Sequence, residues 1–312
     1  MDQGREKSDT SRRTVLAAGM SMLASCNNSK SILVHEHILV DFAGAAIASP
    51  SRYVRDEVIA AAKPKLDAIV KLGCTRMLEC TPNFLGRDPT LLAKLSQLCG
   101  IEIWTNTGLY AANQYRHLPK YAETESATEL SRRWIAEWKN GIDGTKPRFI
   151  KIGVNNSPLG EWDKKLVRAA AITSLETGLT IASHTGTGAA VEQVEILSNM
   201  NFPLQKFVWV HAQNEKDHNV HRQIAKAGAW VEFDGIGPTT LDWHKDCLEF
   251  MAKENLLHRV LISQDTGWWH VGERGGGDYR DYDVIYKDFL PKIQQQWWKQ
   301  LLWDNPRAAF GT

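Results

Sequence analysis

The sequence predicts an α/β protein built as a single (β/α)8 TIM barrel, and three observations support this fold class. Eight apolar, β-branched segments alternate with segments of helical periodicity, and such alternation predicts a parallel sheet. The chain has 312 residues, enough for a barrel, which typically needs about 250. Five of the segments carry metal-binding side chains where a strand is expected to end, and barrels of this kind place their active sites at that end.

The expected strands fall near residues 32–40, 75–81, 101–107, 148–154, 180–185, 206–212, 229–234 and 259–264. Helical spacing of apolar residues between them predicts helices around Val167, Ala170, Ala171 and Leu175, and around Ala190, Val194 and Leu197. The longest connection, residues 110–147, is expected to contain its own helix near residues 129–139. The segment that follows the last strand, residues 267–283, is interpreted either as a mobile lid over the barrel mouth or as a solvated surface loop.

Composition narrows the function classes. Hydrophobic residues make up 43% of the chain and charged residues 23%, as in ordinary globular proteins. The net charge of +1 gives no polybasic surface for nucleic acid, so the expected partner is a small-molecule substrate. No apolar run reaches the roughly 18 residues that span a bilayer.

Residues 1–26 are predicted to be an export signal, and residues 27–312 the barrel domain. Arg12 and Arg13 are adjacent, and a short apolar stretch follows at residues 15–24. The stretch ends in Leu-Ala-Ser-Cys, which resembles a bacterial lipobox with Cys26 as the lipidated residue. This predicts an exported protein, periplasmic or on the cell surface, that meets a membrane only through a lipid anchor. The alternative is an N-terminal helix with a chance arginine pair.

The remaining cysteines and two further histidines are interpreted as structural or surface residues. Cys74, Cys80, Cys99 and Cys247 form no CxxC pair, so they are expected to be buried small hydrophobic residues. His218 and His221 lie in the polar run NEKDHNVH, which is expected to be a solvated loop.

Six side chains at the strand ends predict a metal centre with two ions: His35, His37, Lys151, His184, His211 and Asp265. Because strand side chains alternate between faces, His35 and His37 share one face while Glu36 points away. One HxH pair is common by chance. Together with an inward lysine, two further histidines and an aspartate at strand ends, it indicates a metal site.

The chain resembles the phosphotriesterase family, including its lactonase branch, within the amidohydrolase superfamily. The resemblance covers essentially all of residues 27–312 and rests on VHEHILVDF, GRDPTLLAKLSQLCGIEIWTNTGLY, RFIKIGVNNSP, RAAAITSLETGLTIASHT, LISQD and NPRAAF. It implies that His35, His37 and Asp265 hold the more buried metal, and that His184 and His211 hold the more exposed one. It also implies that Lys151 bridges both as a carbamate (N6-carboxylysine), and that Tyr110 lies beside the metals.

The cofactors implied are two divalent ions, zinc first and manganese, cobalt or iron as alternatives, with CO2 as the lysine carbamate. A lysine amine buried beside two cations favours its neutral form, which reacts with CO2 to give an anion able to bridge. Two such ions about 3.5–4 Å apart activate a shared water, and Asp265 is expected to accept its proton.

The predicted function is therefore a metal-dependent hydrolase of lactone, carboxylic ester or phosphotriester bonds. One alternative is a metal-dependent phosphodiesterase or nuclease on a related barrel. Another is a non-catalytic surface lipoprotein on the same fold. The sequence is compatible with a homodimer and does not decide the oligomeric state.

Two departures from the family pattern bear on the substrate and on the barrel floor. Lactonase relatives usually carry an Arg-Tyr pair where this chain has Gly235 and Ile236. The expected substrate pocket comprises Tyr110, Gly235, Ile236, Trp268, Trp269 and His270. The family's N-terminal hairpin is nearly absent, so the barrel floor is either open or covered by another segment.

Overall fold

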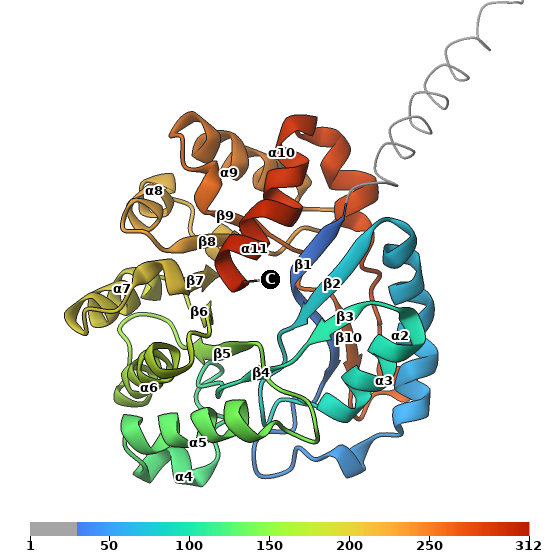
Figure 1. Ribbon diagram of the computed structural model, residues 1–312, viewed down its shortest axis with the longest axis vertical. Coiled ribbons are helices and arrows are strands. Elements are labelled where there is room, and N and C mark those ends of the chain that lie inside the picture. The colour runs from blue at the N-terminus through green and yellow to red at the C-terminus, as the bar shows by residue number, and fades with distance from the viewer. Residues whose placement is uncertain (1–29, 312) are drawn as a thin grey trace, which may run out of the picture.

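The structure, a computed structural model that describes residues 30–311, is a barrel of parallel strands ringed by helices (Figure 1). The strands are β1 (Ser31–Val40), β2 (Cys74–Glu79), β3 (Glu102–Trp104), β4 (Asn106–Thr107), β5 (Phe149–Val154), β6 (Ile181–Thr185), β7 (Phe207–Val210), β8 (Trp230–Phe233), β9 (Val260–Ile262) and β10 (Gly267–His270). They pair in the orders β10-β1-β2-β3 and β4-β5-β6-β7-β8-β9. The last strands return to the first, where the Asp265 backbone N–H donates to the His35 carbonyl over 3.1 Å. The predicted fold class is confirmed.

Two of the eight predicted strands are interrupted. The third is divided at Thr105 into β3 and β4, and the eighth continues beyond Asp265 as β10. Strand β10 pairs in parallel with β1, with His37 opposite Gly267 and Val40 opposite His270. Gly267 has φ +96°, and a Cβ there would lie 2.0 Å from the His37 carbonyl oxygen, so the close pairing needs glycine. The interpretation of this segment as a lid or a solvated loop is therefore wrong at residues 267–270, which belong to the sheet.

Most helices cover the outside of the barrel, and α11 lies over the centre of the strand ring (Figure 1). The helices are α2 (Arg55–Lys71), α3 (Pro89–Cys99), α4 (Lys120–Thr124), α5 (Ala127–Asn140), α6 (Glu161–Thr177), α7 (Ala189–Asn199), α8 (His218–Lys226), α9 (Leu241–Lys253), α10 (Gln295–Lys299) and α11 (Asn305–Phe310). The helices predicted around residues 129–139, 167–175 and 190–197 are confirmed as α5, α6 and α7. Leu175 differs from its predicted inward position, since it is 55% exposed. Helix α5 begins with a capping box between Ser126 and Glu129.

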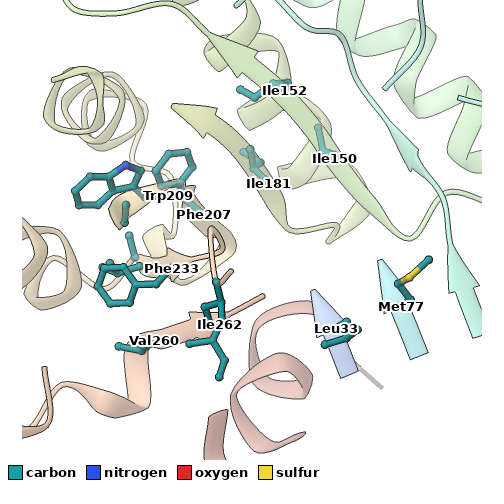
Figure 2. Close-up of a cluster of buried hydrophobic side chains, with 14 of the residues drawn as sticks. Leu33, Met77, Ile150, Ile152, Ile181, Phe207, Trp209, Phe233, Val260 and Ile262 are labelled. Carbon is teal, nitrogen blue, oxygen red and sulfur yellow. The ribbon is translucent and has the colours of Figure 1, made fainter. Parts of the chain in front are cut away.

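Strand side chains alternate between an outer core under the helices and an inner core inside the barrel. Figure 2 shows part of the outer core, with Leu33, Met77, Ile150, Ile152, Ile181, Phe207, Trp209, Phe233, Val260 and Ile262 labelled. The inner core contains Ile32, Val34, Leu78, Cys80, Trp104, Phe149, Ala182, Val208, Val210, Trp230, Leu261 and Ala309. The period-2 alternation of β-strands produces both layers from one set of strands.

The C-terminal segment closes the barrel floor. In Figure 1 the C-terminus lies at the centre of the strand ring, with α11 beside it. Ala309 is fully buried in the inner core, and its carbonyl accepts a hydrogen bond from the Thr180 hydroxyl over 2.5 Å. Phe310 packs edge-on against Phe149, with ring centroids 5.9 Å apart. The floor is thus covered by residues from the far end of the chain.

Two further predictions about local structure have opposite outcomes. Cys74, Cys80, Cys99 and Cys247 are buried free thiols, as predicted. His218 and His221 lie on helix α8, and His221 is fully buried, so the prediction of a solvated loop is wrong. The polar sequence NEKDHNVH gave no indication of a helix, and the inner face of that helix packs on α9.

The predicted export signal, with Arg12, Arg13 and the lipidation residue Cys26, lies outside the described residues. Within residues 30–311, none of the helices combines the length and apolarity that crossing a membrane demands.

Docking of the C-terminal segment depends on Asn305, and this can be tested. Its side-chain amide donates to the carbonyls of Leu257 (2.8 Å) and Val260 (2.7 Å) at the start of β9. Asn305→Ala removes both hydrogen bonds and leaves the Leu257 carbonyl with only the Val260 backbone N–H as donor, so we expect urea unfolding to show a loss of about 2 kcal/mol. The exposed Gln296 hydrogen bonds only to its neighbour Gln294 among the described residues, and Gln296→Ala should change stability by less than about 0.5 kcal/mol. Equal losses in the two variants would contradict this role of Asn305.

Candidate metal centre

The six predicted ligand side chains meet at the carboxyl ends of the strands. Lys151 Nζ lies 3.3 Å from His35 Nε2. Asp265 Oδ1 lies 3.1 Å from His37 Nε2 and 3.7 Å from His35 Nε2. His211 Nε2 lies 2.6 Å from His184 Nδ1. The structure therefore brings together all six residues, which come from β1, β5, β6 and the turns after β7 and β9.

Two of these side chains reach the centre through unusual backbone conformations. Val208 and Val210 face the inner core, so simple alternation would turn His211 outward. His211 instead has φ +64°, and its ring lies inside the barrel beside His35, with centroids 5.2 Å apart. Asp265 likewise has φ +51°. Non-glycine residues rarely adopt this left-handed region, and such residues concentrate at functional sites.

The outer nitrogens of three histidines are held by hydrogen bonds. His35 Nδ1 lies 2.8 Å from Glu232 Oε1 and 3.0 Å from Asp234 Oδ2. His211 Nδ1 lies 2.7 Å from Asp234 Oδ1, and His37 Nδ1 lies 2.7 Å from the Thr81 hydroxyl. A histidine that donates from Nδ1 carries its lone pair on Nε2, the tautomer that binds metals. Three Nε2 lone pairs therefore point into the centre.

The donor set fits divalent cations. The lone pair of His37 Nε2 faces a lone pair of Asp265 Oδ1. Within residues 30–311 this buried carboxylate oxygen has no hydrogen-bond partner. The ligand atoms of His35, His37 and Asp265 lie within 4.8 Å of one another. Burial, aided by the charge of Lys151, lowers the pKa of His35 to about 3, so its imidazole is neutral as metal binding requires. Imidazole and carboxylate ligands suit zinc and related ions.

Asp234 and Glu232 are functional residues that sequence reasoning missed. Burial alone would raise the pKa of Asp234, but the neighbouring His211 and His35 outweigh it and hold that pKa well below its usual range. Burial and the carboxylate of Asp234 raise the pKa of Glu232 well above its usual range. Of these two neighbouring acids, Asp234 is therefore the one on which the site favours a negative charge. A signal was present in the sequence, because two acids at alternate positions of the apolar strand WVEFD face the same side.

Asp234 orients ligands and does not itself face the metal positions. Both of its carboxylate oxygens are occupied, Oδ1 by His211 Nδ1 and Gln213 Nε2, and Oδ2 by His35 Nδ1 and the His211 backbone N–H. One carboxylate thereby fixes the orientation of a histidine from β1 and of the histidine that follows β7.

Aromatic rings surround the centre at the barrel mouth. Tyr110 lies beside His184, with ring centroids 5.0 Å apart, and Trp268 lies against His37 at 4.2 Å. Phe42, which was not predicted, stacks on Trp268 at 5.9 Å and is 43% exposed. His270 lies 5.8 Å from Phe42. Next to His184 lies an open cavity of about 470 Å³, and four of its lining residues carry amide side chains: Asn113, Gln114, Asn155 and Asn156.

Two predicted pocket residues, Trp269 and Ile236, do not line this mouth, and a third, Gly235, has no room for a side chain. Trp269 lies on the opposite face of β10 from Trp268 and packs in the outer core, because strand side chains alternate. Ile236 is 2% exposed and also belongs to the outer core. At Gly235 a Cβ would lie 2.7 Å from Gln213 Nε2, so any side chain there would displace the amide that supports Asp234.

Comparison with known proteins gives a family match over nearly the whole chain. The model of the phosphotriesterase family matches residues 21–310. The phosphotriesterase homology protein of Escherichia coli is 26% identical over 293 residues, which cover 89% of this chain and 97% of that protein. The crystal structure of that protein superimposes on this one with a TM-score of 0.77 at 24% identity. The match covers 91% of this chain and 99% of the Escherichia coli chain.

Two further relatives carry names of activities. An aryldialkylphosphatase of Saccharolobus solfataricus is 27% identical over 280 residues, with 88% of this chain and 85% of that protein covered. A phospho-furanose lactonase of Mycoplasmopsis synoviae is 24% identical over 287 residues, which cover 84% of this chain and 80% of that protein.

The roles of Asp234 and Glu232 can be distinguished by measuring how strongly variants of each bind metal. We expect the barrel centre to contribute close to two divalent ions per chain to the metal content measured by elemental analysis. Asp234→Asn removes the charge that holds two histidines and places an amide donor against their N–H groups, so metal affinity should fall roughly 10- to 100-fold. Glu232→Gln is the matched control, because it changes the neighbouring acid, whose charge is disfavoured by burial and by Asp234, and it should keep near wild-type affinity in a chelator competition. An Asp234→Asn protein with unchanged affinity would contradict the orienting role.

Proposed function

Because the chain belongs to the phosphotriesterase family, we propose that this hydrolase uses two divalent metal ions to cleave lactones and carboxylic esters. The proposal rests on the orientation of His35, His37 and His211. The Nδ1 atom of each ring is hydrogen-bonded, which leaves the lone pair on Nε2. These Nε2 atoms face Lys151, Asp265 and His184, respectively. A surface that merely binds a partner needs no such arrangement. Zinc is the first expected metal, with manganese, cobalt or iron as alternatives.

We assign the ligands in two groups. His35, His37 and Asp265 would hold one ion, because their ligand atoms already lie together. His184 and His211 would hold the second. Lys151 is 2% exposed, and its amine lies between the two groups, 3.3 Å from His35 Nε2. As a carbamate it would supply the bridging anion, since a protonated amine cannot bind a metal.

Bound metal ions would polarise the scissile carbonyl and bring the pKa of a bound water toward neutrality. The side chain of Asp265 is 25% exposed, so it can accept a proton and release it toward solvent. Its backbone is fixed for this role, because its carbonyl accepts hydrogen bonds from Trp268 Nε1 (2.9 Å) and Arg280 Nη2 (2.8 Å). Asp265 therefore serves as both ligand and proton acceptor.

The surroundings of the centre favour an uncharged acyl substrate. The rings of Phe42, Tyr110 and Trp268 offer apolar contact, and the amide-lined cavity beside His184 offers hydrogen bonds without formal charge. The relatives include one named a phospho-furanose lactonase and one named an aryldialkylphosphatase. Phosphotriester cleavage is then a side activity of the same site.

A hydrolysis screen of the zinc- or manganese-loaded protein tests the substrate class. Lactones, aryl carboxylic esters and aryl phosphotriesters are compared by kcat/KM under one set of conditions. Lactones or esters should be the best substrates. A clear preference for phosphotriesters would overturn the assignment while leaving the hydrolase family intact.

The proton-accepting role of Asp265 predicts a specific kinetic result. Asp265→Asn retains an oxygen ligand but cannot take a proton at neutral pH, so kcat should fall by roughly 10²–10⁴ with a smaller loss of metal. Steady-state kinetics and elemental analysis on the same sample measure both. Near wild-type turnover with two metals bound would show that Asp265 is only a ligand, and His270 at the mouth would be the next residue to examine.

Lys151 is tested by a pair of substitutions that differ in charge. Lys151→Ala should lose metal and activity, because the bridging anion is gone. Lys151→Glu should keep part of the metal, since a carboxylate can bridge in its place, and short carboxylic acids should partly restore the alanine variant. Two metals bound to Lys151→Ala without added acid would contradict a bridging lysine.

A further inference from the structure

A second group of metal-binding side chains lies outside the barrel, between α8 and α9. His218 and His221 are one turn apart on α8, and Cys247 faces them from α9, which neighbours α8 on the outside of the barrel (Figure 1). Their ligand atoms all lie within 4.8 Å of one another. His221 and Cys247 are fully buried, whereas the His218 side chain is 21% exposed and gives access from solvent. None of these three residues belongs to the barrel centre.

The hydrogen bonds around the two histidines leave their inner nitrogens facing each other. His221 Nε2 lies 2.8 Å from the Ala212 carbonyl, which can only accept, so this nitrogen carries the proton and Nδ1 carries the lone pair. His218 Nε2 lies 3.1 Å from a carboxylate oxygen of Asp246, which assigns its proton in the same way. The two Nδ1 atoms are 3.1 Å apart. Two lone pairs at that distance repel, so a cation must lie between them, either a proton or a metal ion.

The third donor favours the metal ion. Cys247 Sγ is buried beside the two nitrogens and takes part in no hydrogen bond with the described residues. Two imidazoles and a thiolate are a typical zinc ligand set. Metal-bound histidines also commonly bond their outer nitrogen to a carboxylate or a backbone carbonyl, as His218 and His221 do here.

We propose that His218, His221 and Cys247 bind a zinc-class divalent ion, separate from the two in the barrel. The ion would clamp α8 to α9. Because His221 also bonds the carbonyl of Ala212, the residue after His211, the clamp would stabilise the turn that carries a barrel ligand. The proposal does not depend on the proposed hydrolase function.

The competing occupant is a proton. His218 lies between Trp243 and Phe250, with ring centroids 5.1 and 4.7 Å away and planes within 17° and 15° of parallel. Aromatic faces stabilise a cation, so a protonated His218 that donates to His221 would also fit this geometry. The two occupants differ in whether Cys247 becomes a metal-bound thiolate.

Cobalt(II) substitution distinguishes them. The barrel centre offers nitrogen and oxygen ligands, so the near-ultraviolet thiolate-to-cobalt absorption reports the second site alone. The full chain should develop this band and saturate at one thiolate-bound cobalt per chain. Cys247→Ala should abolish the band, and His218→Gln should weaken cobalt binding at this site at least tenfold, with circular dichroism verifying the fold of each variant.

Two controls separate this site from the barrel centre. Cys80→Ala removes the buried cysteine of the inner core and should leave the band unchanged. Asp234→Asn weakens the barrel centre and should also leave it unchanged, so failure of the hydrolase proposal and of this one are distinguishable. No thiolate band in the cobalt-saturated full chain, or a band that persists in Cys247→Ala, would overturn the proposal; the first result assigns the proton.

Discussion

The ionised carboxylate of Asp234 is the interaction on which the metal centre depends. It accepts hydrogen bonds from His35 Nδ1, His211 Nδ1, the His211 backbone and Gln213, and it is fully buried. Burying a lone carboxylate is costly, and these donors offset the cost. In return, two imidazoles from opposite parts of the chain are fixed in the tautomer that metals need. Burial and the charge of Asp234 raise the pKa of Glu232 beside it, which disfavours a second buried charge.

The same region stores backbone strain. His211, Asp265 and Trp268 all have left-handed φ values without being glycine, at a cost of about 1–3 kcal/mol each. Hydrogen bonds hold the first two in place: the Asp234 carboxylate receives the His211 N–H, and the Asp265 carbonyl receives Trp268 and Arg280. His211 and Asp265 follow the ends of β7 and β9, and Trp268 lies within β10, so the barrel provides the rigid frame that tolerates them.

The barrel is closed and braced by segments distant in sequence. The C-terminal helix α11 covers the floor with Ala309 and Phe310. On the outside, α8 bonds back to the turn after β7 through His221 and Ala212. The chemistry-bearing turns are therefore supported from both sides of the sheet.

Local patterns along the chain were enough to predict the barrel and the six side chains that gather at its mouth. Alternating strand and helix patterns located all eight strands, and His35, His37, Lys151, His184, His211 and Asp265 meet as their strand-end positions implied. These features depend on local periodicity and on the rule that parallel strands end at one edge.

Several features of the site depend on contacts that form only when the chain folds. The inward turn of His211, the pairing of β10 with β1 and the role of Asp234 arise from contacts between residues far apart in the chain, which local periodicity does not encode. For the same reason, the polar sequence around His218 and His221 did not indicate that these residues lie on a helix with a buried face. A histidine's neighbours across an interface, here Cys247 on α9, decide whether it faces water or a ligand, and those neighbours exist only once the chain has folded.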